Sequence, residues 1–526
     1  MPSSNTTSDT DSHSTALISS GGRAVYETPL YYQSLIGLLK PLYRLHVWRR
    51  SHKNDNYQQE VDQRFGKQYP PRPVVNAMSD KGVVWCHAVS LGETNTVAPL
   101  LDVLLASGYQ IWLTNTTQTG FARGASRFAK EIADGQMSHS YVPVDTPAVI
   151  ETFLTHVQPI AALFVETELW ANILTKLSQQ HIPSILVNGR LSASSFKSYQ
   201  KIGAVSASMM KNLTLIIAQN SDSAKRFRQL GASSANIRVA GSLKWVINTS
   251  KLDDKSTDIA AENTAIYHKK IELKKAFGIA ERSVWVAAST HDGEEDAALL
   301  LQQQILSQSA LAATLLIIIP RHPERFDTVA ALIQKTGLKM ARRSDGEMIG
   351  ADTQVYLADS MGEMMTWYQL ADVALVGGSL VEVGGHNPVE PASVATPVLM
   401  GRYTQSCQNV VDKLSEVGAL YQPNNAFYRP ITIAGSSRAD TQTANLHKVA
   451  THKKSSRKKT AYNTDDAAHI CQQLEIWLSD LPLAAQAGQA GAQMTVQQQA
   501  VLTRQFMMIE DVIEQPIIQH SSQELL

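Results

Sequence analysis

Residues 371–391 read ADVALVGGSLVEVGGHNPVEP, and this stretch predicts a strand that ends in a ligand-binding turn. The apolar run at 371–376 has the character of a buried parallel strand. Gly377 and Gly378 follow it directly, and glycines let the backbone approach a ligand without a Cβ in the way. We therefore expect Gly378 and Ser379 to lie at a nucleotide-binding turn. The alternative is a glycine-rich loop without a ligand.

The second half of the same stretch predicts a helix start. Asn387 and Pro388 fit the N-cap and the first helical position, and the free N–H groups at such a helix start favour an anion such as phosphate. Glu390 falls in the first turn, where its carboxylate can accept hydrogen bonds from a ribose diol. An ordinary helix cap is the alternative.

Two series of short apolar strands alternate with helical stretches along the chain. The first series lies at 83–89, 110–114, 141–144, 161–165, 184–187 and 215–218. The second lies at 284–288, 315–319, 355–357, 373–376 and 398–400. A polar stretch at 248–262 separates them. Each series predicts a doubly wound parallel sheet, and two such α/β domains commonly bind a ligand in a cleft at the carboxyl ends of their strands.

Composition limits the function classes. Lys plus Arg and Asp plus Glu each total 47, so the formal charge is zero and no global field attracts nucleic acid. The three cysteines, Cys86, Cys407 and Cys471, are far apart and lack metal-ligand spacing, which suits a reducing compartment. The sequence contains no Walker A, GxSxG, HExxH or kinase signature, which disfavours ATP hydrolysis and serine-hydrolase chemistry.

Residues 30–54 form a distinctive segment near the N-terminus. The segment is rich in leucine and aromatic residues, but Lys40, Pro41 and Arg44 interrupt it, so it is a poor membrane-spanning helix. Aromatic residues with a basic flank suit a segment that lies in the interface of an anionic membrane. A helix packed on the first domain is the alternative.

Three other segments stand apart from the two series. Residues 1–29 are rich in Ser, Thr and Asp and predict a disordered extension. Residues 436–466 are polar and basic, and we interpret them as a flexible, solvated insertion in preference to a patch that binds lipid or nucleic acid. Residues 496–512 predict a helix that packs back on the core.

Charged side chains follow the strands of the first series. Glu93 comes just after the strand at 83–89, where a helix dipole and nearby N–H groups are expected to keep its carboxylate ionised. Such a carboxylate can act as a base, although a simple capping role is the alternative. Glu166 and Glu168 follow 161–165 and are costly to bury unless they are paired or used. Glu168 could orient an acceptor hydroxyl, whereas Glu166 could equally be structural. Arg190 follows the strand at 184–187 and could bind either of these glutamates or a substrate carboxylate.

Imidazole and guanidinium groups follow the strands of the second series. His291 comes after 284–288, and Arg321 and His322 come after 315–319, where they can bind a phosphate or a sugar carboxylate. Gly362 and Met364 lie at a helix start after the strand at 355–357, and its N–H groups could hold a nucleobase or phosphate edge. A metal site is disfavoured because the histidines do not form a local ligand pair.

Seven motifs together carry a family resemblance. They are SLGE at 90–93, ETELW at 166–170, NGRLS at 188–192, GSLK at 241–244, STHDGEE at 289–295, PRHPER at 320–325 and GGHNPVEP at 384–391. Within about residues 30–422 the chain resembles the 3-deoxy-D-manno-octulosonic acid (Kdo) transferases of lipopolysaccharide biosynthesis in Gram-negative bacteria.

The resemblance implies a GT-B glycosyltransferase, with two Rossmann-like doubly wound domains facing across a cleft. It implies that Kdo moves from CMP-Kdo to a lipid A precursor (lipid IVA), with inversion, at the cytoplasmic face of the inner membrane. The protein would be held there peripherally or by a single N-terminal anchor. The expected partners are CMP-Kdo, the lipid A precursor and the membrane surface, without nucleic acid, and neither a cofactor nor a metal is expected.

In the family, the glutamate that matches Glu93 is the general base. Glu168 is a second candidate catalytic residue, on its position after the strand alone. Because Kdo carries a carboxylate, a cationic or hydrogen-bonding group must offset it, and the candidates are Arg190, Lys244, Arg321 and His291. The implied domains are an acceptor domain at 55–247, a linker at 248–270, a CMP-Kdo domain at 271–495, and a helix and tail at 496–526. Two rivals remain: a GT-B transferase or epimerase that uses another nucleotide sugar, and a membrane-associated nucleotide-binding protein without catalysis.

Overall fold

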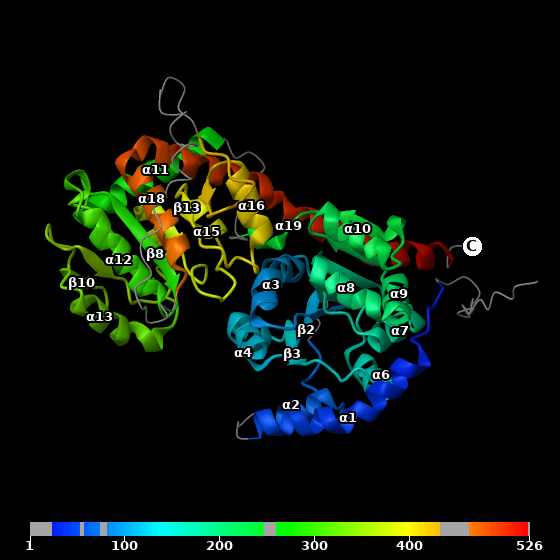
Figure 1. Ribbon diagram of the computed structural model, residues 1–526. Coiled ribbons are helices and arrows are strands. Elements are labelled where there is room, and N and C mark those ends of the chain that lie inside the picture. The colour runs from blue at the N-terminus through cyan, green and yellow to red at the C-terminus, as the bar shows by residue number, and fades with distance from the viewer. Residues whose placement is uncertain (1–23, 53–56, 74–80, 247–258, 432–461, 524–526) are drawn as a thin grey trace, which may run out of the picture. The chain divides into compact units, whose positions relative to one another are not determined.

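The computed structural model describes residues 24–52, 57–73, 81–246, 259–431 and 462–523 (Figure 1). Its contacts divide the chain into two units, one of Met1–Ser250 with Ala500–Leu526 and one of Lys251–Gln499. Most of the predicted extension at 1–29, the start of the predicted linker at 248–270 and most of the predicted insertion at 436–466 lie outside the described residues.

Unit 1 is built on a seven-stranded sheet in which every pairing is parallel. The strand order is β3-β2-β1-β4-β5-β6-β7. The strands are β1 Val83–His87, β2 Gln110–Asn115, β3 Met137–Tyr141, β4 Ala161–Val165, β5 Ser184–Gly189, β6 Leu215–Ala218 and β7 Ile237–Val239. Ten α-helices described in this unit before its last strand are α1 Leu30–Ser51, α2 Tyr57–Arg64, α3 Leu91–Ala106, α4 Gln118–Arg127, α5 Ala129–Ala133, α6 Pro147–Val157, α7 Ala171–Gln179, α8 Ala193–Lys201, α9 Gly203–Asn212 and α10 Ser221–Gln229.

Side chains on the strands of unit 1 alternate between two cores. Val84 and Cys86 of β1 pack in one cluster with residues of α3, whereas Val83 and Trp85 pack in another with residues of α6 and α7. Because neighbouring residues of a strand point to opposite faces, both faces of the sheet are buried. This arrangement explains why the strands read as nearly continuous apolar runs.

Unit 2 repeats the architecture with another seven-stranded, wholly parallel sheet. The strand order is β10-β11-β9-β8-β12-β13-β14. The strands are β8 Val284–Thr290, β9 Leu315–Pro320, β10 Met340–Arg342, β11 Val355–Leu357, β12 Val373–Val376, β13 Val398–Leu399 and β14 Leu420–Tyr421. Its described α-helices include α11 Ile259–Ala276, α12 Glu294–Leu306, α13 Phe326–Lys335, α14 Met364–Leu370, α15 Val389–Ser393, α16 Gln408–Glu416 and α18 Thr464–Ser479. The predicted fold class, α/β with two doubly wound parallel sheets, is confirmed.

Helix α19, Leu481–Gln523, begins in unit 2 and ends in unit 1. Ala484 and Ala487 join the core of unit 2, whereas Val501 and Ile509 join the core of unit 1. The predicted helix boundary at 496 was therefore wrong, because the small residues before it also form helix and pack against the second unit.

Two other predicted boundaries were wrong. The strand expected at 141–144 is β3 at Met137–Tyr141, because Pro143 lacks the N–H that a strand at 141–144 would use, while the polar residues before Tyr141 find buried partners. His139, for example, bonds Asn115 through its Nε2 atom at 2.7 Å. The linker expected at 248–270 extends too far, because α11 already begins at Ile259.

Candidate functional site

The strand order brings the predicted residues of unit 1 to one edge of its sheet. Strands β1, β4 and β5 are neighbours, so Glu93, Glu166 and Arg190, which follow them, come from adjacent strand ends. Lys244 joins this edge from a 3₁₀ turn at Leu243–Trp245, because the Leu243 N–H donates to Asn188 Oδ1 at 2.9 Å. Residues far apart in the sequence therefore form one acidic and basic cluster.

Glu93 is half-buried in the first turn of α3. The Val89 N–H donates to Glu93 Oε2 at 2.8 Å, whereas the Ser90 hydroxyl lies 3.5 Å from Oε1. The pKa of Glu93 is raised to about 7, chiefly by burial and to a smaller extent by the negative charges of Glu166 and Glu168, while the Val89 N–H opposes the rise. Desolvation therefore outweighs the N–H groups, so Glu93 ionises less readily than a helix start alone predicts.

Glu166 and Lys244 form an ion pair in this cluster. Lys244 Nζ lies 3.1 Å from Glu166 Oε1, a pairing that favours the structural alternative for Glu166. The Arg190 N–H donates to the Glu166 carbonyl at 3.3 Å, which fixes the turn after β5 beside the turn after β4. Glu168 is exposed, and its role as a partner of an acceptor hydroxyl stays a prediction.

In unit 2, three histidines meet at the carboxyl ends of neighbouring strands. Strand β8 lies between β9 and β12, so His291, His322 and His386 come from adjacent loops. His291 Nε2 and His386 Nε2 are 2.8 Å apart, and the two rings are stacked with an interplanar angle of 5°. His322 meets His291 edge-on, with ring centroids 5.3 Å apart.

The stacked pair is neutral near pH 7. Burial lowers the pKa of His386 to about 4, and burial also lowers the pKa of His291, helped by the charges of His322 and Arg321. The short contact therefore requires one ring to donate its Nε2 proton to the other. Such a pair offers hydrogen bonds without a charge of its own.

Arg321 supplies the positive charge beside this pair. Its N–H donates to the Thr290 carbonyl at 3.0 Å, which ties β9 to β8. Within the described part of the chain, the Arg321 guanidinium has no ion-pair partner within 4.0 Å. Burial raises the pKa of Glu390, and the charge of Arg321 opposes this rise, so a carboxylate and an available guanidinium lie near each other.

The glycine turn after β12 is not an open anion site. The buried Glu294 carboxylate accepts the N–H groups of Gly378 at 2.7 Å, Ser379 at 3.0 Å and Leu380 at 2.9 Å. The Ser379 hydroxyl donates to the Val376 carbonyl at 2.6 Å and is fully buried. These N–H groups are therefore already bonded within the unit, and the assignment of Gly378 and Ser379 to a nucleotide-binding turn stays a prediction.

The other predicted contacts lie in turns. Asn387 Oδ1 accepts the Val389 N–H at 3.2 Å, as an N-cap does, although α15 begins at Val389 and has only five residues. Gly362 has a φ of +87° in an exposed turn before α14, and Met364 is the first residue of that helix. The turn of Gly362 follows β11, and Arg321 follows β9. Because β11 and β9 are neighbours, the turn and Arg321 come after adjacent strands.

Two residues of unit 2 were missed by the sequence reasoning. His386 stacks on His291, and Glu294 holds the glycine turn, yet neither was assigned a role. The signals were present: His386 lies between Gly385 and the predicted cap, and Glu294 follows a glycine, Gly293, three residues after His291.

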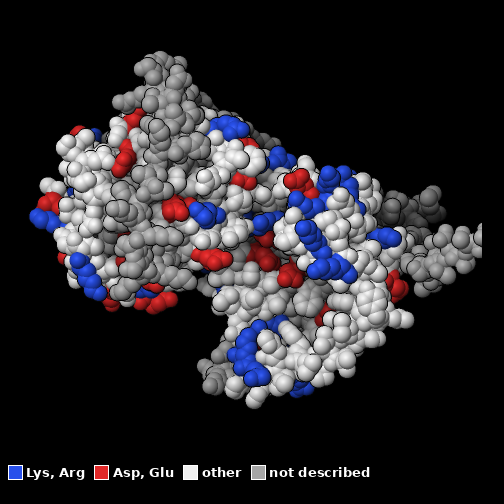
Figure 2. Space-filling view, viewed as in Figure 1, with Lys and Arg blue, Asp and Glu red and all other residues white. Residues whose placement is uncertain are grey.

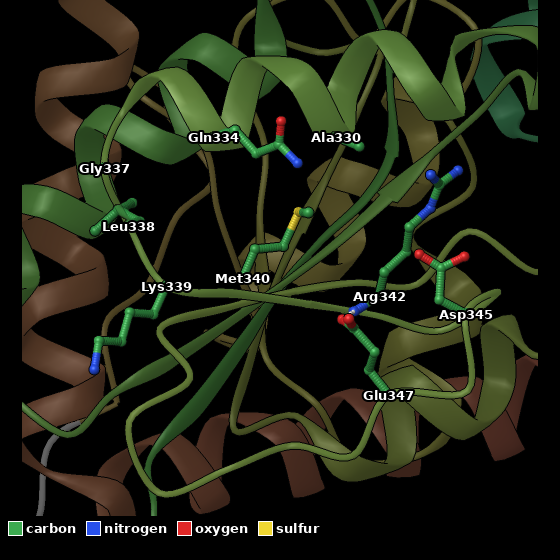
Figure 3. A pocket seen from close by; sticks show the side chains of 9 residues that line it. All are labelled: Ala330, Gln334, Gly337, Leu338, Lys339, Met340, Arg342, Asp345 and Glu347. Carbon is green, nitrogen blue, oxygen red and sulfur yellow. Dashed lines mark hydrogen bonds between the residues drawn. The ribbon is translucent and has the colours of Figure 1, made fainter.

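A hollow of about 430 Å³ lies elsewhere in unit 2, along the edge strand β10 (Figure 3). Arg342 and Glu347 line one side of it and Lys339 the other (Figure 3). Its cations are already engaged, because Arg342 pairs with Asp359 and Lys339 bonds Asp352 at 2.6 Å. The hollow is therefore a weaker candidate for an anionic ligand than the histidine cluster. Among the residues that the structure describes, no group of three or more His, Cys, Asp or Glu side chains is arranged to hold a metal ion.

Comparisons with known proteins agree with these motifs. Residues 59–247 match the family model described as 3-deoxy-D-manno-octulosonic-acid transferase (kdotransferase). The chain is 34% identical over 399 residues to the 3-deoxy-D-manno-octulosonic acid transferase of Haemophilus influenzae, covering 75% of this chain and 87% of the relative. It is also 34% identical over 408 residues to the enzyme of the same name from Bordetella pertussis, covering 77% and 89%.

A solved structure matches part of the chain. It is the crystal structure of the C-terminal CMP-Kdo binding domain of WaaA from Acinetobacter baumannii, which is 31% identical, covers 42% of this chain and 98% of that one, and has a TM-score of 0.29. The full-length relatives cover most of this chain at more than 30% identity. The chain therefore belongs to the Kdo transferase family of glycosyltransferases.

Proposed function

We propose that this Kdo transferase moves Kdo from CMP-Kdo to a lipid A precursor with inversion at the anomeric carbon, and that Glu93 is the general base. The observation that carries the proposal is the half-buried Glu93 carboxylate, whose pKa is raised to about 7 at the strand ends of unit 1. A base is most effective when its pKa lies near the working pH, because it is then ionised yet still takes a proton readily.

The reaction needs one proton transfer and one displacement. Glu93 takes the proton of an acceptor hydroxyl as that oxygen bonds to the anomeric carbon of Kdo. The bond from that carbon to the phosphate oxygen breaks, and CMP leaves with the electron pair. A single displacement from the face opposite to the leaving group inverts the anomeric carbon.

Unit 2 offers the groups that suit the donor. Arg321 carries a guanidinium that can bind a phosphate or a carboxylate through two hydrogen bonds, and it would stabilise the charge that develops on the leaving CMP. His291 and His386 provide neutral hydrogen-bonding groups beside it. Glu390 is placed near Arg321 and suits the ribose hydroxyls, while the turn of Gly362 suits the cytosine edge.

Helix α1 is proposed to lie on the membrane that holds the acceptor, on the inner-membrane side facing the cytoplasm. Its side chains Leu38 and Leu42 are 75% and 61% exposed, and Tyr31, Leu35 and Leu45, which are also exposed, continue the stripe at helical spacing. The described helices include none whose apolar stretch is long enough to cross a bilayer. An exposed apolar stripe that runs towards the exposed Arg49 in the last turn of the helix suits the interface of an anionic membrane.

Basic side chains also gather elsewhere on unit 1. Figure 2 shows Lys and Arg over α8 and α10, two helices that carry Lys197, Lys201, Lys225 and Arg228. Helix α8 follows Arg190 at the end of β5. A basic surface beside the proposed acceptor site supports an acceptor that carries phosphates.

The test is a transfer assay that varies both substrates. The intact chain is incubated with a lipid A precursor and either CMP-Kdo or a UDP-sugar, and the product is analysed by mass and by the NMR signature of its anomeric carbon. Transfer from CMP-Kdo alone, with inverted configuration, is expected. Transfer only from the UDP-sugar would favour the rival nucleotide-sugar enzyme, and CMP-Kdo binding without transfer would favour a non-catalytic binding protein.

A further inference from the structure

A buried carboxylate links helix α1 to the rest of unit 1. Glu60 of α2 is 1% exposed and lies between two arginines. It accepts a hydrogen bond from Arg50 of α1 and another from Arg64 Nε at 2.9 Å. Gln118, at the start of α4, donates to the other Glu60 oxygen at 3.2 Å. Glu60 therefore joins α1, α2 and α4.

Hydrogen bonds continue from this carboxylate towards Glu93. Arg64, itself 1% exposed, donates to the Thr116 carbonyl. The N–H groups of Thr116 and Thr117 donate to the Val89 carbonyl at 3.1 and 2.9 Å. The Val89 N–H in turn donates to Glu93 Oε2 at 2.8 Å. The backbone of Val89 thus lies between the loop that Arg64 holds and the proposed base.

Helix α1 is also fixed at its other end. The Tyr32 hydroxyl donates to Asp145 Oδ2 at 2.9 Å, and Asp145 also accepts the Ile173 N–H at 2.9 Å. Between these anchors Val47 is fully buried, while the apolar stripe of α1 faces outward. The helix is therefore held to unit 1 by buried polar contacts at two places.

The chemistry of the link suits positioning more than stability. Removing two charges from water is costly, and apolar residues often stabilise a core equally well. A hydrogen-bonded ion pair instead fixes direction and distance, because each bond has a preferred geometry.

We propose that Glu60 is a positioning residue that ties α1 to Val89, so that docking of α1 on an anionic lipid surface sets the position of the Glu93 carboxylate. This inference rests on the proposed role of Glu93 as base. The Val89 N–H contact favours the ionised form of Glu93. Loosening the link weakens this contact and therefore makes Glu93 harder to ionise. The other groups that act on Glu93 are Glu166 and Glu168, and Cys86 lies close enough to respond to its charge.

The test compares Arg50→Gln with Arg50→Lys in the full chain, on vesicles that contain an anionic phospholipid and the acceptor. For Arg50→Gln we expect the acidic limb of the profile of kcat/KM against pH to move upward by about half a unit, with an about threefold loss at pH 6. The KM for CMP-Kdo should not change. Arg50→Lys should restore most of the rate and the wild-type limb, because it keeps a donor for Glu60.

The matched control is Arg72→Gln, which removes an exposed arginine of the same unit that bonds Gln158 at 2.8 Å. It should keep the wild-type profile. A second variant, Glu60→Gln, leaves the buried Arg64 without its charge partner. If the thermal unfolding of this variant stays cooperative, its acidic limb should shift at least as far as that of Arg50→Gln.

Two results separate this inference from the proposed function. A folded Arg50→Gln variant with a wild-type limb, or an equal shift in Arg72→Gln, would overturn the positioning role alone. Full activity of Glu93→Gln would overturn the proposed base and the positioning role with it.

Discussion

The raised pKa of Glu93 makes a specific prediction about the dependence of transfer on pH. If Glu93 must be ionised to accept the hydroxyl proton, kcat/KM should follow its titration in the free enzyme, with a midpoint near the pKa of about 7. The ionised fraction then rises from about one tenth at pH 6 to about nine tenths at pH 8, so kcat/KM should rise about tenfold. An ordinary exposed glutamate would already be ionised at pH 6 and would give a flat profile.

The perturbation is Glu93→Gln, which keeps the size of the side chain but removes the base. General-base catalysis is worth about 100- to 10,000-fold, so the rate should fall by that factor and the remaining rate should lose its rise between pH 6 and 8. The assay is initial-rate transfer of Kdo with a coupled supply of CMP-Kdo, with CMP binding measured separately to show that the fold is kept.

A second variant tests the sign of the electrostatics. Glu166→Gln removes a like charge beside Glu93 and leaves Lys244 without this carboxylate, so both effects should move the acidic limb below that of the wild type. A wild-type profile that is flat from pH 6 to 8, or a limb that moves upward in Glu166→Gln, would refute the reasoning about the environment of Glu93.

Three further predictions concern the donor groups, the glycine turn and the membrane helix. Arg321→Gln should weaken CMP-Kdo binding by about 10- to 100-fold, because one charge-assisted hydrogen bond contributes about 1.5–3 kcal/mol. An unchanged affinity, measured by calorimetry, would contradict the assignment of Arg321 to the donor. Glu294→Gln should lower the free energy of unfolding by about 1–3 kcal/mol in urea titrations, since an amide cannot accept all the N–H groups of the glycine turn, and a neutral effect would contradict that role. Leu38→Glu or Leu42→Glu should each weaken sedimentation with anionic vesicles by about tenfold, and wild-type binding by both variants would refute the docking of α1.

The sequence predicts much of the fold because parallel strands buried on both faces are continuous apolar runs. The carboxyl ends of such strands meet at one edge, so Glu93 and Arg190 in unit 1, and His291 and Arg321 in unit 2, could be grouped before any coordinates. The position of strand β3 was predicted wrongly because most of its residues are polar. They are buried through specific hydrogen bonds, which a hydrophobic pattern does not reveal.

The candidate site shows the same limit. A glycine turn predicts free N–H groups, but only the structure shows that Glu294 occupies them. A helix start predicts an ionised Glu93, but the balance between its N–H partner and its burial depends on side chains distant in sequence. The stacking of His386 on His291 joins loops that are 95 residues apart, and no local pattern encodes it.

The most direct measurement compares the intact chain with Glu93→Gln in transfer of Kdo from CMP-Kdo to a tetraacylated lipid A precursor, read by the mass of the product. We expect the intact chain to add Kdo, and the variant, though folded and able to bind CMP, to add it at least about 100 times more slowly. Equal transfer by the two proteins, or no transfer by a folded intact chain that binds CMP, would contradict it.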